Sequence, residues 1–329
     1  MTDLALSVDH ASDDVQADRP QTPIALSQVG VTGVEKVVRL GTEGTERPLF
    51  LTVDCAVELG RDQRGAHMSR FDEAIEATVV GPASSLDGLA ARIAERVRDV
   101  QGARRAEVWL RARYPELREG PASGTPNEEL RTALAAASAV EGATRRLVGA
   151  EAQGMTACPC GQAMAAREAR ARLATEGFDD EEIERVLEAV PVATHNQRGL
   201  GTLWVGPPDD APDGAVGPED LLPIVEGSMS SEIYELLKRP DEAHVVEKAH
   251  ARPRFVEDCV REMLRLAVER MGRLGDRTFM SARQENLETI HRHNVVAEHG
   301  GLVADLAREL RGERVAQESL TPAGWLRRS

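Results

Sequence analysis

The sequence has few aromatic residues, few cysteines and no excess of basic residues, and each shortage excludes a class of protein. Aromatic residues make up 3% of the 329 residues, although a hydrophobic content of 41% is enough for a globular protein with a real core. The four cysteines are too sparse for a disulfide scaffold, which indicates a reducing compartment and makes the cytoplasm the expected location. The net charge of −15 argues against a general nucleic-acid binder, because such a protein needs a basic surface.

Long apolar runs are lacking as well. We recognise neither a signal peptide nor a membrane-spanning segment, so no membrane partner is expected. Residues 1–22 are acidic and polar, and we expect them to form a disordered N-terminal lead-in. The rest of the chain is long enough for one large domain or two ordinary ones.

Hydrophobic periodicity predicts an α+β fold of antiparallel sheets with helices on one face. Apolar residues at every odd position from Leu49 to Leu59 indicate a half-buried strand that includes Cys55. Residues 115–129, with three prolines and two glycines, are expected to form a loop. The other expected elements are strands over 106–114, 130–157, 201–205 and 279–283, and helices over 86–100, 161–190 (two helices), 219–226, 228–238 and 253–271, with an interruption at 238–242.

Residues 155–198 contain the clearest candidate for chemistry. The segment begins with Cys158-Pro159-Cys160 and ends with His195-Asn196-Gln197-Arg198, with the two expected helices between them. If this helical excursion folds back, two thiolates and an imidazole can meet around one metal ion. The spacing is not a standard zinc-finger signature, so an alternative stays open. In that alternative the thiols are small buried hydrophobes and His195 begins a strand.

Two other segments carry polar residues that can bind a ligand. His67, Ser69 and Arg70 follow a glycine and could present a phosphate site, although an ordinary polar loop has the same composition. Glu257 falls on the apolar stripe of a predicted helix, where a buried carboxylate needs a partner. The alternative for Glu257 is a solvated glutamate at the start of a helix. His291, close to His293, becomes a plausible acid–base group if a metal lies beside it.

Taken in order, these segments resemble the type IB GTP cyclohydrolases, including the archaeal branch that starts methanopterin synthesis. The resemblance extends over roughly residues 20–300. It is carried by six motifs: Gly30-Val31-Thr32-Gly33-Val34-Glu35-Lys36, His67-Met68-Ser69-Arg70-Phe71, Cys158-Pro159-Cys160, His195-Asn196-Gln197-Arg198, Leu237-Lys238-Arg239-Pro240-Asp241-Glu242 and Glu288-Thr289-Ile290-His291. It implies the tunnelling fold (T-fold), with a first module over residues 23–150 and a second module over 151–329 that carries the metal site. It also implies a homotetramer with active sites at subunit interfaces.

The resemblance further implies a reaction and a set of roles. Water adds at C8 of the guanine of GTP, formate leaves, and the ribose carbons recyclise into a 7,8-dihydroneopterin phosphate. One divalent metal per site, Fe(II) or Zn(II) with Mn(II) as a third candidate, would be bound by Cys158, His195 and Glu242, and Cys160 competes with Cys158 as the thiolate. Glu257 would anchor the guanine edge. The implied catalytic residues are His291, Glu288 and His67, and the implied triphosphate contacts are His67, Ser69, Arg70 and Arg198.

The branch of the family and hence the product stay open at this point. The long insert between Cys160 and His195 and the segment after His291 are similar to the archaeal branch, whose product is 7,8-dihydroneopterin 2′,3′-cyclic phosphate. The acidic, Arg- and Ala-rich composition is similar to the bacterial folate enzymes, whose product is the triphosphate. Two other functions are compatible with the same fold: a non-catalytic pterin- or purine-binding protein, and another T-fold enzyme with a purine-derived substrate.

Overall fold

A computed structural model of the chain describes residues 15–41, 46–316 and 319–328. In chain order the elements are β1 (Leu26–Leu40), β2 (Arg47–Leu59), α1 (Met68–Val79), α2 (Leu86–Gln101), β3 (Arg105–Glu119), β4 (Pro126–Val140), β5 (Ala143–Ala157), α3 (Pro159–Thr175), α4 (Asp180–Ala189), β6 (Asn196–Gly206), α5 (Pro218–Gly227), β7 (Ser231–Glu232), α6 (Arg239–Ala251), α7 (Val256–Met271), a 3-10 turn (Gly272–Leu274), β8 (Phe279–Leu287), β9 (Val295–Leu302), α8 (Val303–Leu310) and α9 (Pro322–Leu326). Among these residues, no helix is both long and apolar enough to cross a membrane.

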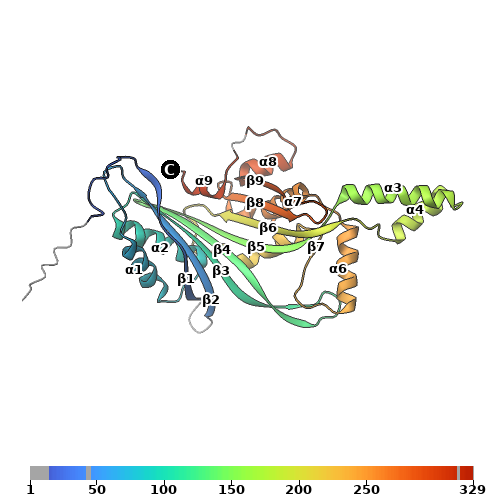
Figure 1. Cartoon of the computed structure of the whole chain (residues 1–329), viewed down its shortest axis with the longest axis horizontal. Coiled ribbons are helices and arrows are strands. Elements are labelled where there is room, and N and C mark those ends of the chain that lie inside the picture. Colours follow the sequence, from blue (N-terminus) through green and yellow to red (C-terminus); the bar gives the residue numbers. More distant parts are fainter. Residues whose placement is uncertain (1–14, 42–45, 317–318, 329) are drawn as a thin grey trace, which may run out of the picture.

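The strands form one continuous antiparallel sheet in the order β1-β2-β3-β4-β5-β6-β8-β9, with the short β7 paired to β5 (Figure 1). The prediction of an α+β fold on antiparallel strands is therefore confirmed. We call β1 to β4 with α1 and α2 the first half, and the elements from β5 to β9 the second half. The expected module boundary at residue 150 lies within β5, and the division into two modules stays a prediction.

Most helices cover one face of the sheet, as the periodicity predicted. On β2 and β3 the alternate residues that face α1 and α2 are apolar and buried, and they form one core with both helices. A second core joins β5, β6, β8 and β9 to α5, α7 and α8. The short helix α9 is an exception, because its Trp325 packs with Trp109 and Trp204 on the opposite, open face of the sheet.

Three sequence predictions about local structure are wrong. Residues 115–129 are not a loop, because β3 and β4 continue as a long hairpin that turns only between Glu119 and Pro126. A helix over 228–238 does not form, and that region contains the short strand β7. Residues 238–242 do not interrupt a helix but begin α6, where Pro240 occupies the first turn that tolerates proline.

The predicted N-terminal lead-in is described only in part. Residues 1–14 lie outside the described residues. Among the rest, the Gln16 carbonyl accepts hydrogen bonds from the backbone N–H groups of Arg64 and Gly65, each at 3.1 Å. The part of the lead-in that the structure describes is therefore attached to the loop before α1.

The sheet divides into two arms at one end. Pairing between β4 and β5 stops at Thr132 and Glu151, while β3–β4 pairing continues to Pro126 and β5–β6 pairing continues to Ala157. The first arm ends against α6, and the second leads into α3 and α4, which project beyond the sheet (Figure 1). The candidate site lies at the end of the second arm.

Candidate active site

Cys158 lies where β5 ends and α3 begins. It is the N-cap residue of α3, and its Sγ accepts a hydrogen bond from the backbone N–H of Gly161 at 3.3 Å. The side chain is partly exposed, so a ligand can reach it. The positive end of a helix dipole suits an anionic sulfur at such a position. Cys160 lies within the first turn of α3 and is exposed.

The helical excursion returns the chain to Cys158 at His195. The Cys158 N–H donates to the His195 carbonyl at 3.1 Å, and the Thr194 hydroxyl donates to the Cys158 carbonyl at 2.9 Å. Both side chains border Gly161, since a Cβ atom placed there would lie 3.4 Å from His195 Cδ2 and 3.8 Å from Cys158 Cβ. The Cδ2 atom, which is bonded to Nε2, therefore lies on the side of the ring that borders the start of α3, where Cys158 is the N-cap residue.

The other edge of the His195 ring faces a glutamine and a glutamate. His195 Nδ1 lies 3.1 Å from Gln197 Oε1, and Gln197 Nε2 donates to Glu288 Oε1 at 3.2 Å. The second carboxylate oxygen, Glu288 Oε2, is 3.9 Å from His195 Nδ1. The structure thus brings together a thiol, an imidazole, an amide and a carboxylate. We call Cys158, His195, Gln197 and Glu288 the site cluster.

The donors of the site cluster fit a metal ion in their chemistry. Sulfur from Cys158 and nitrogen from His195 are a mixed soft and borderline pair that suits Zn or Fe(II). Within the described residues, however, no group of three or more His, Cys, Asp or Glu side chains is arranged to hold a metal. One chain therefore offers Cys158 and His195 as donors, and Glu288 lies at the opposite edge of the His195 ring, 3.9 Å from Nδ1.

Glu242, the third predicted ligand, is not part of this cluster. It is exposed on the first turn of α6, whereas the other end of that helix approaches α3, where Gln162 Nε2 donates to the His250 carbonyl at 2.6 Å. The rise of an α-helix separates residues 242 and 250 by roughly 12 Å. This separation was not predicted, because residues 238–242 were expected to interrupt a helical run rather than to begin a helix.

The neighbouring Asp241 has a structural role that the sequence reasoning missed. Its buried carboxylate accepts hydrogen bonds from the N–H groups of Ala122, Ser123 and Lys238 and from the Ser123 hydroxyl, at 2.7 to 2.8 Å. Burial acts to raise the pKa of Asp241, but these hydrogen bonds outweigh it and hold the pKa below its usual range. Asp241 thereby fastens the tip of the β3–β4 hairpin to the start of α6.

The predicted phosphate contacts of the first half lie in a different part of the chain. His67 is the N-cap residue of α1 and its carbonyl accepts from Gln101 Nε2 at 2.8 Å, while Arg70 Nη1 donates to the Val100 carbonyl at 3.2 Å. Ser69 is exposed beside them. α1 and α2 lie at the opposite end of the sheet from α3 (Figure 1). Within one chain, His67, Ser69 and Arg70 are therefore not brought to the site cluster.

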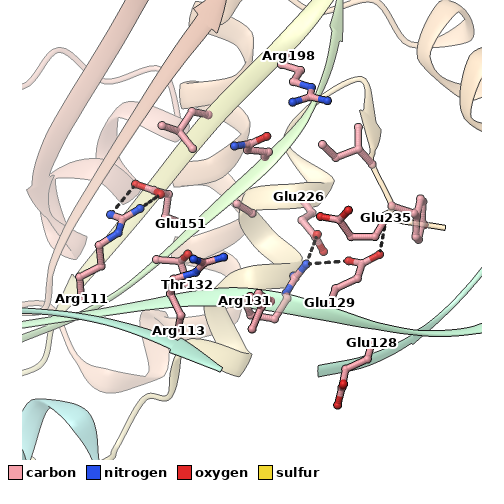
Figure 2. Close-up of a pocket in the computed structure, with 16 residues that line it drawn as sticks. Arg111, Arg113, Glu128, Glu129, Arg131, Thr132, Glu151, Arg198, Glu226 and Glu235 are labelled. Carbon is pink, nitrogen blue, oxygen red and sulfur yellow. Dashed lines mark hydrogen bonds and ion pairs between the residues drawn. The ribbon is translucent and has the colours of Figure 1, made fainter. Parts of the chain in front are cut away.

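Arg198 lines a cavity of about 700 Å³ at the point where the two arms separate (Figure 2). It follows Gln197 on β6 and so points to the other face of the strand. Arg111 and Arg113 from β3 line the same cavity, where Arg111 forms an ion pair with Glu151. The wall on the helix side is a buried ion-pair network: Arg131 with Glu226 at 2.8 Å, Arg118 with Glu226 at 3.2 Å, and Arg118 with Glu129 at 3.1 Å.

The remaining predicted residues are exposed. Glu257 lies on the first turn of α7 and is exposed, although Val260 and Leu264 on the same stripe are buried. Within this chain Glu257 is therefore solvated, and its carboxylate is open to a ligand. His291 lies in the loop after Glu288, and its ring stacks on that of His293 with centroids 5.1 Å apart.

The other two cysteines belong to the core. Cys55 and Cys259 are buried among apolar side chains, as the strand pattern predicted for Cys55, and burial raises the pKa of each thiol to about 12. A thiol that is so hard to ionise is a poor metal ligand. The candidate thiolates are therefore Cys158 and Cys160.

Comparisons with known proteins identify the family of the chain. Residues 13–297 match the family described as type I GTP cyclohydrolase folE2. The GTP cyclohydrolase MptA of Methanothermobacter thermautotrophicus is 41% identical over 308 residues, which cover 90% of this chain and 95% of that protein. The MptA of Haloferax volcanii is 41% identical over 311 residues, covering 92% and 99% of the two chains.

Among solved structures, the fold is similar to that of the uricase from Arthrobacter globiformis. The TM-score is 0.51 over 92% of this chain and 99% of the uricase, and the sequences are 9% identical. At that identity the likeness concerns the fold alone. The sequence matches, which extend over nearly the whole length, are what identify the chain: it belongs to the family of type I GTP cyclohydrolases.

Proposed function

We propose that the chain is a metal-dependent GTP cyclohydrolase that opens the imidazole ring of GTP at C8, releases formate and forms a 7,8-dihydroneopterin phosphate. The observation that carries this proposal is the meeting of Cys158, His195 and Glu288 at the ends of three separate segments. Family membership supplies the substrate class and makes the reaction a first step of pterin synthesis. The similarity to the archaeal MptA proteins favours the 2′,3′-cyclic phosphate as the product.

The residues of the site cluster have distinct tasks in this proposal. Cys158 and His195 would hold Fe(II), Zn(II) or Mn(II), with the third ligand a carboxylate that one chain does not place beside them. When bound, the metal supplies Lewis acidity that makes water nucleophilic near neutral pH. Glu288 lies next to the His195 ring and, with His291 in the loop that follows, is the candidate for proton transfer.

A second copy of the chain would complete the substrate site. Arg198 follows Gln197 of the site cluster on β6, with its side chain on the other face of the strand, whereas His67, Ser69 and Arg70 are at the other end of the sheet. Phosphate contacts from both groups to one substrate require two chains. We therefore propose a homo-oligomer, a tetramer as the family resemblance implies, with each site between subunits.

The decisive measurement is stoichiometric formate release from GTP by the purified protein, made anaerobically with Fe(II), Mn(II) or Zn(II). Cys158→Ala is expected to abolish both metal retention and formate release without unfolding the protein. Cys160→Ala is the matched control and should be milder, because its thiol is exposed within the first turn of α3. No formate with any of the metals would refute the proposal, and metal loss in Cys160→Ala alone would identify the other thiolate.

A further inference from the structure

Gln197 is the residue that connects the imidazole and the carboxylate of the site cluster. It is the second residue of β6, where it pairs with Thr156 of β5, and it is 6% exposed. One end of its amide meets His195 and the other meets Glu288. Gln197 is neither a proposed metal ligand nor a proposed substrate contact.

The chemistry of Glu288 fixes the orientation of the Gln197 amide. Gln197 Nε2 donates to Glu288 Oε1 at 3.2 Å, so the NH₂ group of the amide faces the carboxylate. The amide oxygen is then left to face His195 Nδ1 at 3.1 Å, and an oxygen can only accept. Nδ1 must therefore carry the proton, and the lone pair of the neutral ring lies on Nε2. This is the edge of the ring that lies on the side of Cys158.

We propose that Gln197 is the positioning residue of the site: it selects the Nδ1–H tautomer of His195 and holds Glu288 as a separate acceptor. The inference rests on the proposed function only in taking His195 as a metal ligand. Partners of this kind, which bind the second nitrogen of a ligating histidine, typically change metal affinity 10- to 100-fold when they are removed. The neighbouring backbone supports the arrangement, because the Thr289 hydroxyl donates to the Asn196 carbonyl at 3.1 Å and ties the Glu288 segment to β6.

Two substitutions separate the two parts of this role. Gln197→Leu removes both hydrogen bonds, and we expect metal affinity to fall 10- to 100-fold. Gln197→Glu keeps an acceptor for the Nδ1–H but cannot donate to Glu288. It should therefore keep metal affinity within a few-fold of the unaltered protein while formate release falls. Gln284→Leu is the matched control: Gln284 is also a buried glutamine on the helix-facing side of the sheet, but it donates to Asn286 rather than to the site cluster.

The experiment combines Zn(II) titration of the metal-free protein against a competing chelator with ¹⁵N NMR of the histidine rings at pH 8. In metal-free protein the His195 signals, assigned by their absence from His195→Gln, should show a protonated Nδ1 and an unprotonated Nε2. An Nε2–H tautomer in the unaltered protein would overturn the inference. So would a Gln197→Leu protein that binds Zn(II) as tightly as Gln284→Leu does. The NMR result does not depend on whether formate is released from GTP. Failure of this inference can therefore be told apart from failure of the proposed function.

Discussion

The two halves of the sheet present different surfaces to the helices that cover them. In the first half, the helix-facing residues of β2 and β3 are apolar throughout, from Leu49 to Leu59 and from Ala106 to Ala112. In the second half, the same face turns polar towards the end of the sheet, where Thr156, Gln197, Gln284 and Asn286 are buried. Buried polar groups cost free energy unless they are paired, and at this end of the second half they surround the site cluster. The contrast assigns the site cluster to the second half and leaves the first half to supply contacts from its surface.

The largest effect is expected from variants that separate the contributions of the two halves. Arg70→Ala in the first half removes a proposed phosphate contact and His195→Ala in the second removes a proposed metal ligand, so each should lower formate release by about 100-fold or more. If each site is shared between chains, mixed oligomers should recover roughly a quarter of the sites by random assortment. Activity would be measured on co-expressed, doubly tagged protein.

The matched control for this mixing experiment pairs two variants of the same half. Cys158→Ala mixed with His195→Ala should recover no activity, because the structure draws both residues from one chain. If mixed oligomers of Arg70→Ala and His195→Ala stay as inactive as their parents, the sharing of sites between chains is wrong.

A smaller effect is expected at Glu257, which tests whether an exposed residue of the second half binds the base. Glu257→Gln places a donor against the N–H donors of guanine, so GTP affinity should fall by roughly 10- to 100-fold. Metal content should not change, since Glu257 is not assigned as a ligand. Calorimetry with GTP gives the affinity, with Asp258→Asn as the neighbouring control. An unaltered affinity would identify Glu257 as a solvated glutamate at the start of α7.

The smallest effect concerns Asp241, which joins the hairpin of the first half to α6 of the second. Asp241→Asn places an amide N–H against one of the backbone donors, and we expect the Tm to fall by about 5 °C at pH 7. Because the pKa of Asp241 is lowered in the folded state, its stabilisation is complete above about pH 4 and is lost as the pH falls below that value.

The difference in Tm between the unaltered protein and Asp241→Asn should therefore be smaller at pH 3 than at pH 7. Thermal unfolding followed by circular dichroism at the two pH values provides the measurement. Glu247→Gln, an exposed change on the same helix, should have little effect at either pH. A difference that grows towards low pH would contradict the assignment of the carboxylate.

What could be predicted from the sequence depended on the range of the interactions. The alternation in β2 and the amphipathic α4 are local patterns, and both elements were found from them. The β3–β4 arm was missed because proline and glycine suggested a loop, while the arm is held by distant partners such as Glu226 and Asp241. The distance of Glu242 from Cys158 and His195 within one chain was missed for a similar reason, since only the start of α6 decides where Glu242 lies.

Gln197 could have been found from the sequence, although Glu288 could not have been attached to it. Residues two apart on an extended strand share a face, so His195 predicts a neighbour at Gln197. Glu288 lies 91 positions further along the chain, and only the pairing of β6 with β8 brings it there. Short periodicities therefore identified the elements and the thiol–imidazole pair, whereas the carboxylate partner depended on strand order.

The tryptophan cluster around α9 is an intrinsic fluorescence probe of the C-terminal segment. The chain has three tryptophans, and all of them, Trp109, Trp204 and Trp325, lie in that one cluster on the open face of the sheet. Trp325 stacks on Phe279 at 5.2 Å and lies under the guanidinium of Arg145. Tryptophan fluorescence should therefore follow the docking and release of α9, a segment beyond the family match that ends at residue 297. Any change in the wavelength or intensity of tryptophan emission would therefore arise from this cluster, and no attached dye is needed.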